Sequence, residues 1–244
     1  MAVGEREKVR EDTGQGVILR SRENIQIEPL TPDEDTLPKQ FLKRVAELGD
    51  RTAMRKKRFG IWQEYTWKES YQRVKDFCLG MVSLGLQRGE KVSLIGENDP
   101  EFYWAEIAIW SAGGITTAIF TDANLMELGY VVENSDSVYI VAHDRNPNIR
   151  NIIYWDDRGL WNYDDPALLS FEDVEERGRA YDREHPGMFE KLIAEGKGSD
   201  TALFSYTSGT TSLPKGAIIR HSNLLYGNRH VINLAPSYPT DNYL

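Results

Sequence analysis

The sequence predicts an α/β fold in which helices flank a mainly parallel, doubly wound sheet. Short apolar runs alternate along the chain with longer segments whose apolar residues recur at helical spacing. Successive strands that are separated by a helix pair in parallel, because the helix carries the chain back across the sheet. A chain of 244 residues, 40% of them hydrophobic, can bury a substantial core around such a sheet.

The first two helices are predicted at residues 36–48 and from residue 67 onward, each with one apolar face. In the second helix the apolar positions that follow a helical period are Tyr71, Val74, Cys78, Met81 and Val82. Thr66 stands just before this helix and Glu69 follows three residues later, which is the spacing of a capping box. The two side chains are therefore expected to satisfy N–H groups at the start of the helix.

The middle of the chain continues the alternation of strands and helices. Strands are predicted at residues 91–95, 115–120 and 137–142, and helices at residues 100–111 and 124–134. The helix at residues 100–111 is apolar almost all round, which indicates a buried helix. Its Trp104 and Trp110 are therefore expected in the core rather than in contact with a ligand.

One connection is too short for this pattern. Only residues 143–150 separate the strand at residues 137–142 from the next apolar run, Asn151–Tyr154. A parallel crossover needs roughly a dozen residues or more, usually including a helix. Either a deletion is repaired by antiparallel or irregular pairing, or the sequence joins two segments that flank absent residues. The sequence favours neither explanation.

Composition narrows the classes of partner. The net charge of −9 argues against a general nucleic-acid surface, and the basic run at residues 55–58 is expected as a solvated turn of a hairpin. The first 24 residues lack the apolar segment of a signal peptide, and no run of about 18 apolar residues occurs, so we expect no transmembrane segment and at most peripheral membrane contact. Cys78 is the one cysteine and cannot form an internal disulfide, which fits a reducing, cytoplasmic location.

Other polar residues give weaker signals. The acidic and aromatic segment at residues 155–165 is expected to be an exposed loop, and Glu175 and Glu176 are expected on the solvated face of a helix. For His221, which with Asn223 opens a late helix, two roles stay open: polar support of the preceding loop, or contact with a ligand. No spacing of His and Cys residues resembles a metal site, so no metal ligand is predicted.

The most informative segment is residues 206–216, with the sequence YTSGTTSLPKG. Six of its first seven residues carry a hydroxyl, and Gly209 permits close approach of the backbone to a ligand. Pro214 fixes the backbone just before Lys215, which adds a positive charge. Such an array of donors around a glycine predicts a loop that binds phosphate.

Flanking apolar runs at residues 202–204 and 217–219 predict that this loop hangs between two buried strands. A Walker A loop is excluded by residue order, because Lys215 precedes its glycine instead of following it. The residues predicted to bind phosphate are Thr207, Ser208, Gly209, Thr210, Thr211 and Lys215. They are expected to bind and orient a ligand, and no catalytic residue is predicted in this chain.

The loop resembles the signature Y/F-T-S-G-T-T-G-x-P-K-G of the AMP-forming adenylate superfamily, which includes acyl-CoA synthetases, peptide-synthetase adenylation domains and luciferases. Ten of eleven positions agree when Leu213 is taken as the free one, and Ser212 replaces the usual glycine. A serine there would cost roughly 1 to 2 kcal/mol if the position needs a positive φ. Residues 64–67 and 92–98 look like the opening strands of the family, and residues 60–62 and 98–104 look most like its long-chain fatty-acid branch.

The resemblance implies a two-step ligation. A carboxylate, which in this branch is that of a long-chain fatty acid, would attack the α-phosphorus of ATP to give an acyl-adenylate and pyrophosphate. The thiol of coenzyme A would then displace AMP. The resemblance also implies that the loop holds the β- and γ-phosphates, while a Mg²⁺ ion is held by residues outside this chain.

The resemblance covers about residues 36–244 and implies the incomplete N-terminal part of a larger adenylate-forming domain. Residues 1–35 are expected to form a polar, irregular extension. Later motifs and a small C-terminal domain are expected in the remainder of the parent enzyme, so this stretch alone is expected to be inactive. Two alternatives stay open: a non-catalytic nucleotide-binding or interaction module, and an adenylating enzyme for a different carboxylate.

Overall fold

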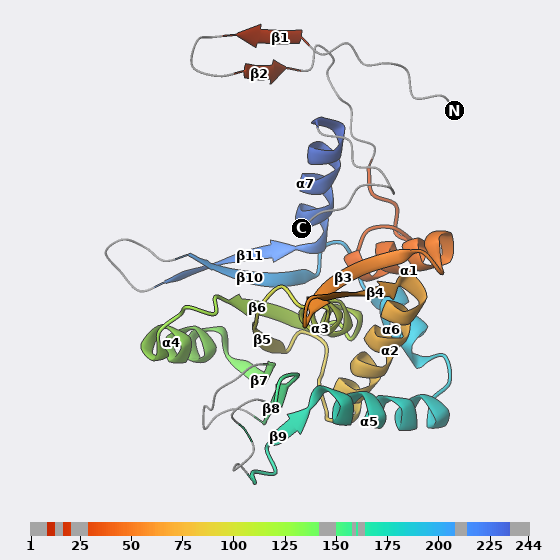
Figure 1. Ribbon diagram of the computed structural model, residues 1–244, viewed down its shortest axis with the longest axis vertical. Coiled ribbons are helices and arrows are strands. Elements are labelled where there is room, and N and C mark those ends of the chain that lie inside the picture. The colour runs from red at the N-terminus through yellow and green to blue at the C-terminus, as the bar shows by residue number, and fades with distance from the viewer. Residues whose placement is uncertain are drawn as a thin grey trace. The chain divides into compact units, whose positions relative to one another are not determined.

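Figure 1 shows the computed structural model, which describes residues 9–12, 17–20, 29–141, 150–157, 160, 164–207 and 214–234. Contacts divide the chain into a larger unit at Leu30–Asn223 and a smaller one formed by Met1–Pro29 with Leu224–Leu244. The smaller unit contains the antiparallel strands β1 (Val9–Asp12) and β2 (Val17–Arg20) and most of helix α7 (His221–Leu234). The expectation of an irregular N-terminal extension is wrong at these strands, while its boundary at residue 35 stays a prediction.

The larger unit is built on a seven-stranded sheet in the order β11-β10-β6-β5-β7-β8-β9. Its strands are β5 (Lys91–Ile95), β6 (Ile115–Ile119), β7 (Ser137–Val141), β8 (Asn151–Tyr154), β9 (Leu168–Ser170), β10 (Thr201–Thr207) and β11 (Lys215–Arg220). All neighbouring strands are parallel except β10 and β11, which are antiparallel. This confirms the predicted α/β class with a mainly parallel sheet.

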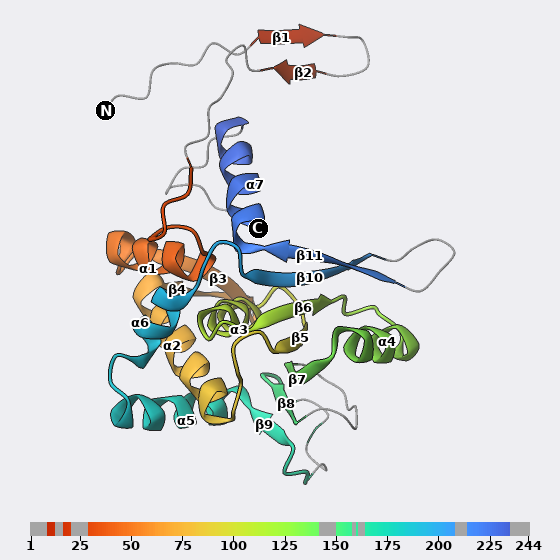
Figure 2. The same cartoon turned by 180° about the vertical axis from the view of Figure 1, so that it is seen from behind.

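The chain winds outward from β5 in both directions. Helix α3 (Pro100–Ser111) leads from β5 to β6, and α4 (Leu125–Ser135) leads from β6 to β7 on the other side of β5. Residues of β7 alternate between the two faces of the sheet, since Tyr139 and Val141 join one core and Ile140 joins a second core with α4. Figure 2 shows α4 apart from the other helices of this unit, which gather around the first core. The sheet is therefore doubly wound, as predicted.

The first core lies beneath the remaining helices of this unit. They are α1 (Leu37–Leu48), α2 (Trp67–Ser83), α5 (Phe171–Glu184) and α6 (Met188–Glu195). The hairpin of β3 (Thr52–Arg58) and β4 (Ile61–Thr66) adds Met54 and Tyr65 to this core. Trp104 and Trp110 are 0% and 9% exposed, which confirms their predicted core positions. Across the described ranges, no helix has both the length and the apolar composition needed to cross a bilayer.

Reciprocal caps fix where three helices begin. The amide of Glu69 donates to Thr66 Oγ1 at 3.1 Å and the amide of Thr66 donates to Glu69 Oε2 at 2.7 Å, so the predicted capping box is confirmed. The same exchange joins Asn124 to Glu127 at the start of α4, and Ser170 to Asp173 at the start of α5. The cap of α4 fixes the start of a helix that borders the candidate site described below.

At two glycines, the backbones of α2 and α5 lie so close together that no side chain would fit between them. A Cβ atom added at Gly178 would lie 1.7 Å from the carbonyl oxygen of Asp76. One added at Gly80 would lie 2.0 Å from the carbonyl oxygen of Val174. The absence of a side chain at these two positions therefore permits α5 to pack directly against α2.

Strand β8 pairs with β7 in parallel, with Asn151 opposite Tyr139, so an antiparallel repair, one of the explanations left open, is wrong. The connecting residues 142–149 lie outside the described residues. In this register β8 starts level with a residue only two positions before the end of β7. The chain therefore returns by only about 7 Å along the strand direction. A short connection can cover that distance without a helix.

Candidate phosphate-binding site

The predicted phosphate-binding loop connects β10 to β11 at one edge of the sheet. In the antiparallel register the last pair before the loop is Thr207 opposite Lys215, so the structure brings these two predicted residues together. Both residues are exposed. The other predicted binding residues, Ser208, Gly209, Thr210 and Thr211, lie outside the described residues. The stem of the loop therefore presents one hydroxyl-bearing residue and one ammonium-bearing residue side by side.

Strand β10 is tied to the rest of the sheet by an indole and by β6. The Nε1 of Trp110 donates to the carbonyl oxygen of Ala202 at 2.8 Å and to the hydroxyl of Thr116 at 3.1 Å. Residues 203–205 of β10 pair in parallel with residues 116–118 of β6. These contacts hold residues 202–205 of β10, so the strand that leads into the loop is anchored to the sheet over that stretch.

Strand β11 does not match the buried strand that the sequence predicts. Most of its residues are exposed, and Ile218 is 65% exposed. β11 lies at the end of the strand order, and within the described part of the chain no strand pairs with its outer side. An apolar run is buried only where neighbouring elements cover both faces of its strand. The expectation of burial is therefore correct in part for β10 and wrong for β11.

Tyr206 and Gly216 form the cross-strand pair next to the stem of the loop. A Cβ atom at Gly216 would lie 3.0 Å from the Tyr206 ring, so the glycine leaves room for the ring on this face of the hairpin. The Tyr206 hydroxyl donates to Asn134 Oδ1 on α4 at 2.8 Å. Burial raises the pKa of the Tyr206 phenol, which keeps it protonated as a donor. The final glycine of the loop sequence thus has a packing role that the sequence alone does not reveal.

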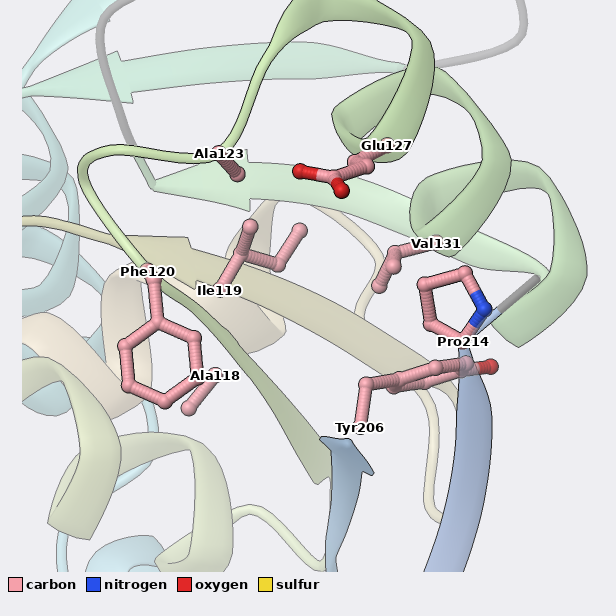
Figure 3. Close-up of a pocket in the computed structure, with 8 residues that line it drawn as sticks. All are labelled: Ala118, Ile119, Phe120, Ala123, Glu127, Val131, Tyr206 and Pro214. Atoms are coloured by element: carbon pink, nitrogen blue, oxygen red, sulfur yellow. The ribbon is translucent and has the colours of Figure 1, made fainter. Parts of the chain in front are cut away.

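A largely apolar hollow adjoins the loop (Figure 3). The space between its walls amounts to about 420 Å³, part of which is open solvent. Its walls come from the end of β6, the start of α4, the end of β10 and the residue before Lys215: Ala118, Ile119, Phe120, Ala123, Glu127, Val131, Tyr206 and Pro214. Glu127 is the one charged lining residue, and its Oε2 accepts from the amide of Asn124 at 3.3 Å. The hollow therefore suits an apolar group.

His221 supports the fold at the end of β11. Its ring is 4% exposed and lies edge-on to the ring of Trp110, and its Nδ1 accepts from the amide of Leu37 at 3.5 Å. Burial lowers the pKa of the imidazole to about 4, so the ring is neutral at pH 7. Asn223 Oδ1 accepts from the amide of Arg220 at 3.0 Å and so caps the start of α7. Of the two roles left open for His221, these contacts favour structural support.

Two carboxylates on helices are desolvated. Glu175 on α5 is 1% exposed and accepts from Arg73 on α2, so the expectation of a solvated position is wrong, whereas Glu176 is exposed as expected. Burial raises the pKa of Glu175 to about 7, and burial also raises the pKa of Glu106 on α3 to about 7. Among the residues with described positions, no group of three or more His, Cys, Asp or Glu could hold a metal ion.

The segment at residues 155–165 is not uniformly exposed. Trp155 is half-buried, and its Nε1 donates to Asp99 Oδ2 at 3.3 Å. Its ring covers Gly96, where an added Cβ atom would lie 2.2 Å from the indole. Trp161 and Tyr163 lie outside the described residues. Trp155 therefore links the ends of β8 and β5, a contact that the expectation of a solvated loop missed.

Comparison with known proteins identifies a family and a fold for this chain. A family model described as AMP-binding enzyme matches residues 41–244. The chain is 25% identical over 203 residues to the long-chain-fatty-acid–CoA ligase ACSBG2 of Xenopus laevis, covering 78% of this chain and 27% of that protein. It is 23% identical over 222 residues to the long-chain-fatty-acid–CoA ligase ACSBG1 of Bos taurus, covering 86% of this chain and 30% of that protein. The chain thus spans less than a third of the length of these relatives.

Solved structures share the fold. The fatty acid AMP ligase from Legionella pneumophila aligns with a TM-score of 0.63 at 19% identity, over 82% of this chain and 32% of that chain. The N-terminal subdomain of NpsA from Klebsiella oxytoca, in complex with 3-hydroxybenzoyl-AMSN, aligns with a TM-score of 0.54 at 19% identity, over 76% of this chain and 41% of that chain. The match of the family model over residues 41–244, together with this fold and the hydroxyl-rich loop, shows that the chain belongs to the AMP-binding enzyme family.

Proposed function

We propose that this chain carries the ATP-phosphate-binding loop of an enzyme that activates a long-chain fatty acid to an acyl-adenylate and then to an acyl-CoA. Membership of the AMP-binding enzyme family supports the adenylation step. The relatives from X. laevis and B. taurus are named long-chain-fatty-acid–CoA ligases, which supports the choice of acid and thiol. The observation that carries the proposal is the pairing of Thr207 with Lys215 at the mouth of the hydroxyl-rich loop.

In the first step a carboxylate oxygen attacks the α-phosphorus of ATP and the bond to pyrophosphate breaks. Negative charge then increases on the phosphate oxygens. Hydroxyl and amide groups of residues 207–211 would donate to the β- and γ-phosphates, and the Lys215 ammonium would offset their charge. Because β10 holds one side of the loop, these donors would need little reorganisation during the reaction. In the second step the thiol of coenzyme A attacks the acyl carbon and AMP leaves.

A Mg²⁺ ion bound to the phosphates would neutralise part of their charge. The described residues contain no cluster of three or more acidic, His or Cys side chains that could hold it. Oxygen ligands suit this ion, and the hydroxyls of the loop are neutral oxygens that bind it weakly without a carboxylate. We therefore assign its carboxylate ligand to another part of the parent enzyme.

The apolar hollow beside the loop supports an apolar acid as the substrate. Phe120, Ile119 and Val131 present hydrocarbon walls, and Pro214 joins the hollow directly to Lys215. An acyl chain in contact with these walls would leave water, which contributes about 0.8 kcal/mol per buried CH₂ group. Its carboxylate could then lie on the side of the loop, where the phosphates of ATP are proposed to bind.

The complete reaction is proposed for a protein longer than these residues. The matched region accounts for 27% of the X. laevis relative and 30% of the B. taurus relative. We propose that residues 36–244 form the N-terminal part of the adenylate-forming domain and that residues 1–35 form an extension of it. Acyl transfer would then depend on the remainder of the parent enzyme.

Substitution of Lys215 tests the phosphate-binding loop. In the complete parent enzyme, Lys215→Ala is expected to lower kcat/KM for ATP by about 100-fold, as expected for the loss of a positioned charge. Lys68→Ala is the matched control, because Lys68 is an exposed lysine on α2 and should leave turnover unchanged. Wild-type turnover by the Lys215→Ala enzyme with ATP, a fatty acid and coenzyme A would show that the loop assignment is wrong.

Calorimetry on the chain of 244 residues separates the alternatives. Tight binding of ATP by this chain alone would favour a self-sufficient nucleotide-binding module. Release of AMP from ATP, a fatty acid and coenzyme A by this chain would contradict its dependence on the rest of the enzyme. If the parent enzyme prefers a carboxylic acid that is not a fatty acid, the proposed substrate is wrong, but the proposed adenylation reaction is not.

A further inference from the structure

The hairpin of β3 and β4 (Figure 1) ends in a cluster of exposed apolar side chains. Phe59 is 94% exposed, Ile61 is 71% exposed and Trp62 is 50% exposed. Single apolar residues on a surface are normal, but three large ones gathered at one turn are not. The base of the same hairpin packs on the first core through Met54 and Tyr65, so the tip is held on a fixed support.

The geometry of the turn makes Phe59 an unexpected residue there. Arg58 pairs with Ile61, so Phe59 and Gly60 alone form the turn, with φ values of 49° and 81°. Two positive φ values identify a type I′ turn, for which Asn-Gly or Asp-Gly is preferred. A bulky residue at positive φ is a conformational outlier. Phe59 therefore does not favour the turn, and at 94% exposure it belongs to neither core, which points to contact with something outside the described chain.

Cations accompany this apolar tip. Residues 55–58 are all basic in a chain whose net charge is −9. Arg55 and Lys56 form ion pairs with Glu64 and Asp99, whereas Lys57 and Arg58 lie beside the turn and face the aromatic rings. The Lys57 ammonium lies 5.8 Å from the centre of the Trp62 ring, and the Arg58 guanidinium lies 5.8 Å from the centre of the Phe59 ring. Aromatic rings flanked by cations are typical of segments that enter the headgroup region of a membrane.

A second exposed apolar patch provides a comparison. Phe120, directly after β6, and Leu125 and Met126, at the start of α4, are 75%, 73% and 84% exposed. This patch contains Asp122 and Glu127 and no basic residue between positions 120 and 127. An anionic surface would therefore repel the α4 patch and attract the hairpin tip. Charge distinguishes two patches that are alike in apolar exposure.

We propose that the β3–β4 hairpin tip is a peripheral membrane anchor, in which Phe59 enters the interface of an anionic phospholipid bilayer while Lys57 and Arg58 contact its headgroups. A specific protein interface buries on the order of 1,000 Å² of surface, whereas the apolar tip consists of three side chains, Phe59, Ile61 and Trp62. A bilayer accepts a small pointed group, because the lipids rearrange around it. The proposal is independent of the nucleotide chemistry proposed above.

Sedimentation with lipid vesicles tests the anchor. The chain is expected to bind vesicles of phosphatidylcholine mixed with phosphatidylserine, and to bind phosphatidylcholine alone at least about 10-fold more weakly. Phe59→Asn is expected to weaken binding to the mixed vesicles by about 10-fold, since it removes the inserted ring. Asparagine tolerates positive φ, so this variant keeps the turn. Phe120→Asn is the matched control and is expected to bind like the wild type.

Several results of these experiments would overturn the membrane anchor. Failure of the wild-type chain to bind the mixed vesicles, or equal binding by Phe59→Asn, would overturn the proposal. Loss of binding in Phe120→Asn alone would move the contact to α4 and would also overturn it. A lipid-free dimer that Phe59→Asn converts to a monomer would assign the tip to a second copy of the chain instead. Unchanged far-UV circular dichroism of both variants shows that lost binding is not lost folding.

Discussion

The close approach of α2 and α5 leads to a sharp prediction about one methyl group. In Gly178→Ala the new Cβ atom would lie 1.7 Å from the carbonyl oxygen of Asp76 and 2.8 Å from the amide nitrogen of Gly80. Both atoms belong to the α2 backbone, so no rotation of a side chain relieves the contact. Because Cβ atoms essentially never come closer than 3.0 Å to a neighbour, α5 would have to recede by about 1.3 Å.

That displacement sets the size of the effect. A gap of about 0.5 to 1 Å already removes a quarter to a half of each dispersion contact across an interface. The affected contacts include the rings of Phe77 and Phe171, which stack with centroids 4.2 Å apart. Alanine itself gains about 1 kcal/mol over glycine inside a helix. We expect the loss to exceed this gain and to lower the free energy of unfolding by about 3 kcal/mol.

Gly129→Ala provides the matched control. Gly129 also lies inside a helix, α4, but an added Cβ atom there meets no atom within 4 Å. The same substitution is therefore expected to raise the free energy of unfolding by about 1 kcal/mol. Urea unfolding at equilibrium measures both variants. A destabilisation of less than about 1 kcal/mol by Gly178→Ala would refute the reasoning, since it would mean that α5 accommodates the methyl group without losing contact.

Three further predictions concern pH and the hairpin turn. Burial raises the pKa of Glu175 to about 7 from 4.5, so its stabilising contribution is complete below pH 4.5 and is lost as pH rises through 7. In Glu175→Gln the free energy of unfolding, measured with urea, should therefore decrease by about 3 kcal/mol less than in the wild type as the pH rises through this range. The same pH profile in the variant and the wild type would contradict this. Burial lowers the pKa of His221 to about 4 from 6.5, so stability should fall as pH drops through that range, by about 3 kcal/mol. An NMR titration of this imidazole with a midpoint near 6.5 would be the opposing result. Phe59→Asn should raise the free energy of unfolding by about 1 kcal/mol, because φ of 49° strains a bulky residue. A lower midpoint in thermal unfolding would argue against that strain.

The sequence predicts much of the fold because local signals and burial agree over most elements. Thr66 and Glu69 mark the start of α2 through groups that contact each other within one turn. The pattern does not predict β9, whose three residues are too few to show a period. It also misplaces Glu175, because the charges of α5 indicate solvent while Gly80 and Gly178 bring that helix against α2. Such close approach depends on two segments far apart in the chain, which no local pattern records.

The candidate site was predictable where its residues are consecutive. The hydroxyl-rich loop and Lys215 are visible in the sequence, and the structure adds the pairing of Lys215 with Thr207. The apolar hollow was not predicted, because its lining comes from β6, α4, β10 and Pro214. The packing of Tyr206 over Gly216 was likewise missed, since it depends on the register of two strands. These features follow from tertiary contacts rather than from composition.

The reversal of direction between β10 and β11 determines where a lysine can act. Parallel strands deliver their last residues to one margin of a sheet, and their first residues to the other. Because β11 runs back along β10, its first residue, Lys215, lies at the same margin as the last residue of β10, Thr207. A strand of six residues that ran the other way would have begun about 20 Å from there. The antiparallel direction of β11 thus places Lys215 at the edge of the sheet where its parallel strands end.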